Sequence, residues 1–294
     1  MNNLDVEQLK TFLTVIDEGT FDAAAEKLFV TPSAISQRIK ALETIVGRIL
    51  LQRTKPILPT GSGKELLLLA REIVLLMNDF EDRLEPSLQA VNQTIPIAVN
   101  ADSLGTWMVP ALALASEFAN FEIRREDEEY SVELLRDGTV MAAITSSSKT
   151  IQGCKTKKLG TMRYRPMATK LFVKKWFRNG FTSQAFASAP VISFDKKDEY
   201  QNRLIKKYVK GTQRPPCHYI PATFDFAIAV SQSMGWGYIS DLQYETLAKK
   251  SSLVEISPGA SIDVTLYIQY WKLSSVTLNN AISTICEYAK YNLH

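Results

Sequence analysis

Apolar residues recur at helical spacing through the first third of the chain, which predicts a run of consecutive helices. A first helix starts at Asp5 and ends before Gly19, a residue type that commonly stops helices. A second, shorter helix covers Phe21–Leu28, with Thr20 as its N-cap. The connections are short, so we expect these helices to pack against one another and against the helix that follows.

The third helix, Thr31–Glu43, starts with a favourable N-cap residue and has Pro32 at its first helical position. Its apolar stripe would be buried, and its other face carries hydroxyl, amide and guanidinium groups. Such groups can bind DNA phosphates and read base edges. Taken alone, the pattern fits an ordinary amphipathic helix equally well. The polar residues of this face are Ser33, Ser36, Gln37, Arg38 and Lys40.

Two short β-prone runs follow, Arg48–Lys55 and Ile57–Thr60, and they predict a wing beside the third helix. The net charge of +3 is too small to indicate nucleic-acid binding by itself. The basic residues nevertheless concentrate here, opposed by one acid, Glu43, which gives one face a positive charge. We expect Arg53 and Lys55 to lie beside a phosphate strand or a minor groove. The basic residues are Arg38, Lys40, Arg48, Arg53, Lys55 and Lys64.

Thr60 opens a long helix that is apolar around most of its circumference. A helix packed only on its own domain is the simpler reading. The wide apolar surface, however, calls for two partners, and we expect them to be the winged domain and a second subunit. Pro86 would end or kink this helix, and Gln89–Thr94 would form a hinge. The main stripe is Leu66, Leu69, Ile73, Leu76, Phe80 and Leu84.

From residue 95 onwards, strand-like and helix-like segments alternate, which predicts an α/β sensor domain, and we expect it to have two lobes. The predicted strands are Ile95–Asn100, Phe121–Arg125, Val140–Thr145, Lys158–Tyr164, Met167–Thr169, Pro190–Phe194, Trp236–Ser240 and Val264–Trp271. The predicted helices are Ser103–Phe118, Tyr130–Arg136, Phe224–Ser233 and Ser275–Tyr291. In such folds ligands bind at the carboxyl ends of strands, between the lobes.

Three segments fall at such strand ends. The first carries Asp102, Ser103, Thr106 and Trp107 and opens a helix, although Ser103 could serve only as an N-cap. Another segment begins at Thr223 and opens a helix of the second lobe. The remaining segment is acidic and could hold a cation, although the helix dipole also favours acids there. Its candidate ligand residues are Glu126, Asp127 and Glu128. A cationic side chain is costly to bury unpaired, so a carboxylate-binding end facing an acidic end favours a basic amino acid.

Several functional classes fit the sequence poorly. The only histidines are His218 and His294, and Cys217 adjoins His218, a poor arrangement for a nucleophile and its base. No phosphate loop or metal-ligand spacing appears, so we expect neither an enzyme nor a bound metal or cofactor. A redox sensor based on Cys154 and Cys217 stays open, although no basic cluster flanks both. The three cysteines are widely spaced and neither a secretion signal nor a membrane span is apparent, so a cytoplasmic protein is expected.

The first sixty residues closely resemble the N-terminus of LysR-type transcriptional regulators. The matching residues are Phe12-Leu-x-Val-x-Asp-x-Gly-x-Phe21, Ala24-Ala25-x-x-Leu28, Thr31-Pro-Ser-Ala-Ile-Ser-Gln-Arg-Ile-Lys-x-Leu-Glu43, Gly47, Leu51-x-Arg53 and Pro59-Thr60-x-x-Gly63. Leu51 stands where the family often has Phe, a conservative core change. The resemblance implies binding to a palindromic operator in double-stranded DNA, with RNA polymerase as a further partner, and a homodimer or tetramer. It places Thr31, Pro32, Ser33, Ser36, Gln37 and Arg38 at the DNA-contacting end of the recognition helix, and Arg53 in the wing.

The remainder resembles the ArgP/LysG subgroup of that family, whose members sense lysine or arginine and control an amino-acid exporter. The matching residues are Ala98-Val-Asn-Ala-Asp-Ser-Leu-x-Thr-Trp107, Glu126-Asp-Glu128, Leu134-Leu-Arg-x-Gly138, Ala143-Ile-Thr145, Leu159-Gly160, Phe194-Asp-x-x-Asp198 and Gln201. The regions around Trp236 and Tyr267–Trp271 fit more loosely, so a regulator of another effector remains the alternative.

The expected architecture is therefore α/β and multidomain. Residues 1–60 form a winged helix-turn-helix, and residues 61–90 form a long dimerisation helix with a hinge. Residues 91–294 form a two-lobed effector domain that resembles periplasmic binding proteins. Lobe I would cover about 91–165 and 267–294, and lobe II about 166–266. The chain would cross to lobe II near Arg163–Ala168 and return near Tyr267.

Overall fold

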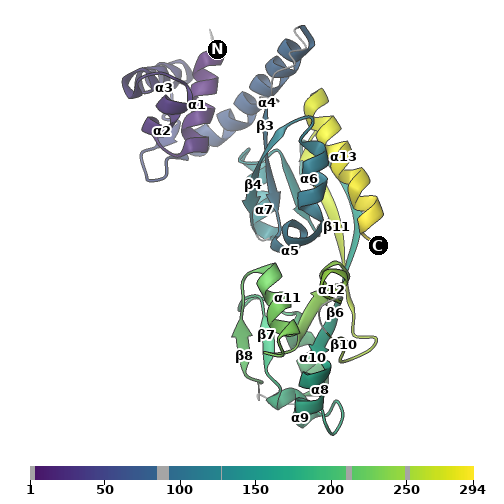
Figure 1. Cartoon of the computed structure of the whole chain (residues 1–294). Coiled ribbons are helices and arrows are strands. Elements are labelled where there is room, and N and C mark those ends of the chain that lie inside the picture. Colours follow the sequence, from purple (N-terminus) through teal and green to yellow (C-terminus); the bar gives the residue numbers. More distant parts are fainter. Residues whose placement is uncertain (1–3, 85–92, 127, 210–213, 249–251) are drawn as a thin grey trace.

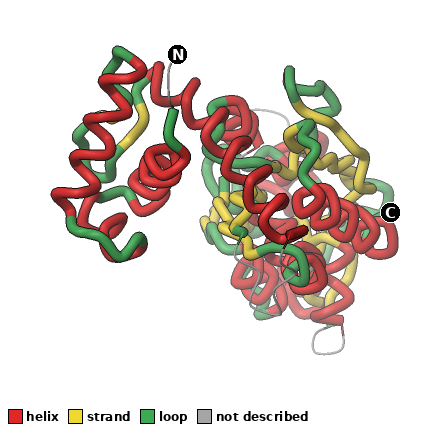
Figure 2. Tube along the Cα trace, turned by 90° about the horizontal axis from the view of Figure 1, so that it is seen from above, coloured by secondary structure: helices red, strands yellow, loops and turns green. Residues whose placement is uncertain are grey.

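The structure is a computed structural model of the chain, and it describes residues 4–84, 93–126, 128–209, 214–248 and 252–294. A small helical domain at the N-terminus leads into one long helix, and this helix runs onto a larger domain of two lobes (Figure 1). Seen from above, the N-terminal helices lie to one side of the two-lobed domain (Figure 2). None of the helices among these residues is both long and apolar enough to cross a membrane.

The N-terminal domain packs three helices, α1 (Val6–Glu18), α2 (Phe21–Lys27) and α3 (Pro32–Val46), around a core that includes Phe12 and Leu42. The three predicted N-caps are confirmed: the side chains of Asp5, Thr20 and Thr31 accept hydrogen bonds from Glu7, Ala23 and Ala34 N–H groups at 3.0, 3.1 and 3.2 Å. The wing is also confirmed. It consists of the antiparallel strands β1 (Leu51–Gln52) and β2 (Leu58–Pro59).

Helix α4 (Gly61–Leu84) begins with the predicted cap, because Thr60 Oγ1 accepts from the Gly63 N–H at 3.0 Å. Gly63 lies so close to the wing that an added Cβ would be 2.1 Å from the Leu50 carbonyl oxygen. The helix contributes Leu67 to the N-terminal core and Leu75 to the core of the two-lobed domain. The second partner of α4 within the chain is thus its own effector domain. An exposed apolar row remains, with Leu69, Phe80 and Leu84 exposed by 40%, 55% and 66%.

Polar side chains tie α4 to both neighbouring domains. Arg71, which is only 7% exposed, binds the carboxylate of Asp17 in α1 and donates from Nε to the Gly138 carbonyl oxygen at 2.9 Å. Lys64 Nζ pairs with Asp137 Oδ2 at 2.9 Å nearer the start of the helix. Near the other end, the buried Asp79 accepts from the Val276 N–H at 2.9 Å. Helix α4 is therefore held against lobe I along most of its length.

Lobe I is built on three parallel strands that lie next to one another in the order β5-β3-β4. These are β3 (Thr94–Val99), β4 (Asn120–Arg125) and β5 (Ala142–Thr145). Helical segments cover the sheet, and α13 packs against α6. The segments are α5 (Ala101–Ser103), the π-helical η1 (Leu104–Met108), α6 (Val109–Ala115), α7 (Glu128–Arg136) and α13 (Val276–Asn292).

Two long antiparallel strands, β6 (Cys154–Thr169) and β11 (Ile262–Trp271), connect the lobes. The first half of β6 pairs with β11 beside β5, and its second half pairs with β9 and β10 in lobe II. The remaining elements of lobe II are α8 (Lys170–Trp176), α9 (Ser183–Ser188), β7 (Val191–Ser193), α10 (Tyr200–Tyr208), β8 (Cys217–Tyr219), α11 (Thr223–Ser231), β9 (Gly237–Ser240), α12 (Asp241–Ala248) and β10 (Leu253–Glu255). The cores of the two lobes therefore share one continuous sheet.

Three predictions from the sequence need correction. The predicted strands Lys158–Tyr164 and Met167–Thr169 are one strand, β6. Pro166 lies within this strand and has no N–H to donate, but its carbonyl oxygen still accepts from the Ile256 N–H at 2.9 Å. The helix predicted from Ser103 starts at Ala101, because Asn100 rather than Ser103 supplies the cap. The helices α8, α9, α10 and α12 were not predicted. Most of the predicted hinge Gln89–Thr94 lies outside the described residues, and Thr94 already belongs to β3.

Candidate functional site

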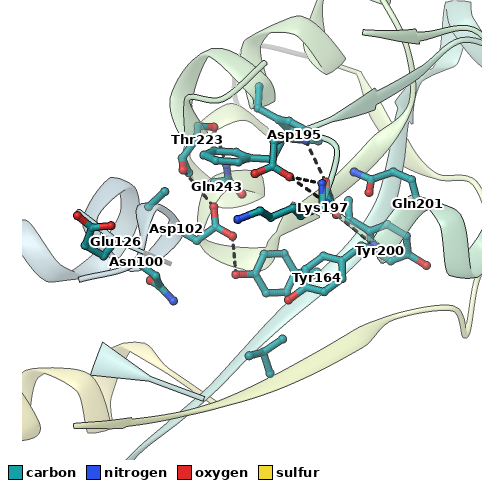
Figure 3. Close-up of a pocket in the computed structure, with 16 residues that line it drawn as sticks. Asn100, Asp102, Glu126, Tyr164, Asp195, Lys197, Tyr200, Gln201, Thr223 and Gln243 are labelled. Carbon is teal, nitrogen blue, oxygen red and sulfur yellow. Dashed lines mark hydrogen bonds between the residues drawn. The ribbon is translucent and has the colours of Figure 1, made fainter. Parts of the chain in front are cut away.

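A cavity of about 360 Å³ lies between the two lobes, within the usual range of ligand pockets, roughly 300–1,000 Å³. Lobe I and the connecting strands contribute one wall, and lobe II contributes the other (Figure 3). The lining residues from lobe I and the connecting strands are Asn100, Ala101, Asp102, Glu126, Tyr164 and Val264. Those from lobe II are Phe194, Asp195, Lys197, Asp198, Tyr200, Gln201, Thr223, Phe226, Tyr238 and Gln243.

The lobe I wall is formed by the carboxyl ends of two parallel strands. The pairing of Val99 with Arg125 aligns the ends of β3 and β4, so Asn100 and Glu126 follow at the same edge of the sheet. The Glu126 N–H extends the ladder by donating to the Val99 carbonyl oxygen at 3.3 Å. Asn100 caps the next helical turn, its Oδ1 accepting from the Ser103 N–H at 2.9 Å. This is the edge at which parallel α/β sheets bind ligands.

Asp102 links the two lobes directly. Its Oδ2 accepts from the Tyr164 hydroxyl at 2.8 Å, and its Oδ1 accepts from Thr223 Oγ1 at 3.0 Å (Figure 3). Thr223 is the first residue of α11 in lobe II, whereas Asp102 belongs to α5 in lobe I. Both donors are neutral hydroxyl groups, so they fix the orientation of the carboxylate without bringing positive charge. Asp102 is therefore a positioned anionic group at the junction of the lobes.

The opposite wall contains a short loop, residues 194–199, that is held by its own carboxylates. Asp198 accepts from the Phe194 and Tyr200 N–H groups at 2.9 and 3.1 Å, so both of its oxygens are used to shape the loop. Asp195 Oδ1 accepts from the N–H groups of Lys197 and Asp198 at 2.7 and 3.0 Å. These turns fix the backbone and present the side chains of Asp195 and Lys197 at the cavity (Figure 3).

The cavity combines negative charge with aromatic rings. Among its lining residues that the structure describes are four carboxylates and one ammonium group. The Tyr164 and Tyr200 rings lie 5.3 Å apart between centroids, and the Tyr200 and Tyr238 rings lie 6.1 Å apart. Burial raises the pKa of Tyr238 to about 12, so its hydroxyl stays neutral and donates to the Ala260 carbonyl oxygen at 2.8 Å. Carboxylates beside aromatic faces suit a cation with an extended hydrocarbon stem.

The structure brings together some of the ligand residues predicted from the sequence. Asp102, Glu126 and Thr223 all line the cavity. Asp127 lies outside the described residues, and for Glu128 only the backbone, at the start of α7, is described. The described residues contain no group of three or more His, Cys, Asp or Glu side chains placed to hold a metal ion.

The other predicted ligand residues lie elsewhere. Ser103 is fully buried, and its Oγ has no hydrogen-bond partner within the described part of the chain. Thr106 and Trp107 line a separate cavity of about 330 Å³, formed with α11, α12 and α13. Thr106 does not point into the cavity between the lobes, because its Oγ1 donates to the Asp102 carbonyl oxygen at 2.6 Å, one turn back along the helix. Ser103, Thr106 and Trp107 therefore do not line the cavity between the lobes, and their ligand roles stay predictions.

Sequence reasoning also missed most of the lobe II wall. In the sequence, Phe194-Asp-x-x-Asp198 and Gln201 contribute to a family resemblance but indicate no role of their own. The hydrogen bonds around Asp195 and Asp198 explain why that spacing occurs, because the two carboxylates build the loop. Tyr164, Tyr200 and Tyr238 gave no local signal, since their proximity depends on the folding of lobe II.

The predicted DNA-contacting face is exposed on α3 and the wing. The side chains of Thr31, Pro32, Ser33, Ser36, Gln37 and Lys40 are exposed, as are those of Arg53 and Lys55 in the turn between β1 and β2. Arg38 is placed differently, because its Nη1 donates to Thr11 Oγ1 at 3.2 Å and lies 3.4 Å from Glu7 Oε2. In this structure Arg38 therefore binds α1, and a contact with DNA would require its side chain to turn outward.

The cysteines do not form a reactive cluster. Burial raises the pKa of Cys154 to about 11 and also raises the pKa of Cys286. Both therefore remain protonated thiols at neutral pH, whereas a redox-sensing cysteine needs a stabilised thiolate. Cys217 is exposed on β8.

Known proteins resemble this chain along its whole length. Residues 6–64 match the family described as bacterial regulatory helix-turn-helix protein, lysR family. The lysine export transcriptional regulatory protein LysG of Corynebacterium glutamicum is 35% identical over 96% of this chain and 97% of its own length. The crystal structure of ArgP from Mycobacterium tuberculosis is 37% identical, with a TM-score of 0.82 and 99% of each chain covered. Full-length LysG from C. glutamicum with bound effector Arg is 34% identical, with a TM-score of 0.74 over 97% of this chain and 98% of that one.

Proposed function

Since the chain belongs to the LysR family of bacterial helix-turn-helix transcriptional regulators, we propose that it senses a basic amino acid, lysine or arginine, and controls the promoter of an amino-acid exporter. The observation that supports this most strongly is the cavity between the lobes, with its carboxylates and tyrosine rings. A relative 34% identical to this chain has been solved with arginine as its effector, and a relative 35% identical is named for lysine export.

The N-terminal domain is proposed to bind DNA through the start of α3 and the wing. The exposed hydroxyl and amide groups of Ser33, Ser36 and Gln37 would read base edges and phosphates in a major groove. Arg53 and Lys55 project from the wing, where they would bind a phosphate strand and fix the register of the domain. Contacts of this kind make the affinity for DNA depend on salt concentration.

The active form is proposed to be a homodimer, or a tetramer built from dimers. The apolar row of Leu69, Phe80 and Leu84 on α4 is exposed in the single chain and would be covered by a second copy. Two winged domains related by a two-fold axis would then read the two halves of a palindromic operator. RNA polymerase would be a further partner at the promoter.

The cavity is proposed to recognise the effector mainly through charge. The side-chain cation of lysine or arginine would lie among the carboxylates of Asp102, Glu126 and Asp195, with its hydrocarbon stem on the tyrosine rings. A bound ligand would contact both lobes at once, so it would change the geometry around the Asp102–Thr223 hydrogen bond that already joins them. Since α4 is bound to lobe I, such a change would alter the positions of the DNA-binding domains in the dimer.

Titration calorimetry on the full-length protein tests this proposal with matched ligands. Arginine and lysine should bind, whereas citrulline and norleucine, which keep the length but lack the cation, should bind at least about tenfold more weakly. Equal binding of arginine and citrulline would show that the carboxylates do not select the ligand. A DNA-mobility assay on the exporter promoter, with and without arginine, then tests whether binding alters the complex with DNA.

A thiol-based redox regulator is the competing function, and the cysteines disfavour it. The raised pKa values of Cys154 and Cys286 leave no pair of activated thiols among the residues that the structure describes. A regulator of a different effector remains the alternative, and it would appear in the same calorimetry as binding of a neutral or acidic amino acid in preference to arginine.

A further inference from the structure

Among the described residues that line the cavity, Lys197 carries an ammonium group. Lys197 lies in the loop after β7, where its N–H is fixed by Asp195, and its side chain extends across the cavity toward Asp102 of lobe I (Figure 3). The next residue back, Lys196, is exposed on the same loop but does not line the cavity. The backbone of Lys197 is thus anchored by Asp195, and its side chain reaches across the cavity.

The ammonium group of Lys197 lies where the side-chain cation of the ligand is proposed to bind. The cavity offers the carboxylates of Asp102, Glu126 and Asp195 to a cation at the end of a hydrocarbon stem, and a lysine side chain is such a group. Like charges gathered without a counterion destabilise a partly buried site, so a cation from the protein offsets the carboxylates when no ligand is present.

We propose that Lys197 is an internal competitor of the effector, occupying the site of the ligand's cation in the empty cavity and leaving it when a basic amino acid binds. This inference rests on the proposed function. Lys197 is an exposed residue, so its side chain can reach solvent when a ligand enters the cavity. Lys197 would therefore set the affinity of the site, lowering it for every cationic ligand.

A Lys197 that binds the carboxylate of the ligand would give the opposite change in affinity. If Lys197 instead bound the ligand's carboxylate, removing its charge would weaken binding, and only for ligands that carry a carboxylate. If Lys197 competes with the ligand's cation, removing its charge removes the repulsion between two cations in one cavity. The affinity for arginine should then rise by about tenfold, which corresponds to about 1.4 kcal/mol. The affinity for agmatine, the decarboxylated form of arginine, should rise as well.

The test is calorimetry of arginine and agmatine on full-length wild-type protein, Lys197→Met and Lys197→Gln, with Lys196→Met as the matched control. Tighter binding of both ligands to both Lys197 variants, with the control unchanged, supports the proposal. Unchanged affinity overturns it, as does weaker binding of arginine, and in both cases the sensing of basic amino acids stands. A lack of binding by every protein would refute the proposed function together with this inference. Binding only to the Lys197 variants would support both.

Discussion

Replacing Arg71 with methionine tests whether one side chain joins the DNA-binding domain to the effector domain. The guanidinium group binds Asp17 of α1 and the Gly138 carbonyl oxygen while only 7% of the side chain is exposed. Methionine keeps the stem of the side chain and removes all of these bonds. Breaking a buried pair by removing one partner is strongly destabilising, since the other partner stays desolvated.

The expected cost follows from the groups that are left behind. The buried Gly138 carbonyl loses a charge-assisted hydrogen bond, which costs about 1–3 kcal/mol. The Asp17 carboxylate is 21% exposed and can be partly rehydrated, so its contribution is smaller than for a fully buried ion pair. We expect a total of about 3 kcal/mol, which would lower the urea midpoint by about 2 M for an m-value of about 1.5 kcal/mol/M.

Two spectroscopic signals separate the domains. The first tryptophan in the sequence is Trp107 and the first tyrosine is Tyr130, so tryptophan fluorescence reports only on the effector domain. Circular dichroism reports on helix content and therefore also on α1–α4. The Arg71→Met variant should lose helical signal at lower urea concentration than the wild type, before the fluorescence changes.

Lys64→Met is the matched control on the same helix. It removes an ion pair whose lysine side chain is 49% exposed, so it should cost less than about 1 kcal/mol. Equal effects of the two substitutions would refute the reasoning from burial, and an unchanged midpoint for Arg71→Met would show that the contact does not hold the domains. A double-mutant cycle with Asp17→Asn would then measure the part that belongs to the ion pair.

Three further predictions concern the cavity, the wing and the thiols. Asp102→Asn should weaken arginine binding in calorimetry by about tenfold or more, because it removes a positioned charge; Asp263→Asn, outside the cavity, should leave the affinity unchanged. Gly63→Ala should destabilise the N-terminal domain in urea unfolding by at least about 2 kcal/mol, because its Cβ would meet the Leu50 carbonyl, whereas Gly61→Ala, with open space around it, should not. Cys217 alone should react rapidly with a thiol reagent at pH 8, since burial raises the pKa values of Cys154 and Cys286; rapid labelling of either would contradict this.

The N-terminal domain could be read from the sequence because its signals are local. Thr31 directly precedes α3, and its Oγ1 accepts from the Ala34 N–H only three residues on, so the side chain that decides the helix start is adjacent to it. The wing follows the same logic, with two short runs around a turn. Ser103 shows where local reasoning fails: Asn100 and Ser103 are both good capping residues, and the end of β3 at Val99 decided between them.

Apart from Thr223, the cavity could be predicted only on its lobe I side. Asp102 and Glu126 follow strands whose order is set by parallel pairing, so strand ends were sufficient to find them. Lys197 and Tyr200 reach the same cavity from a loop and a helix of lobe II, nearly one hundred positions further along the chain. Their approach to Asp102 depends on the long strand β6, which runs from lobe I into lobe II. No local sequence pattern encodes that approach.

Helix α7 runs from the ligand cavity to the long helix α4. It starts at Glu128, two residues after Glu126 in the cavity wall, and it is followed by Asp137 and Gly138, which bind Lys64 and Arg71. Its nine residues span about 14 Å at 1.5 Å per residue. Because a helix hardly compresses along its axis, a displacement of its first turn must also displace its last. The route from effector to DNA reader can therefore bypass the strands that connect the lobes.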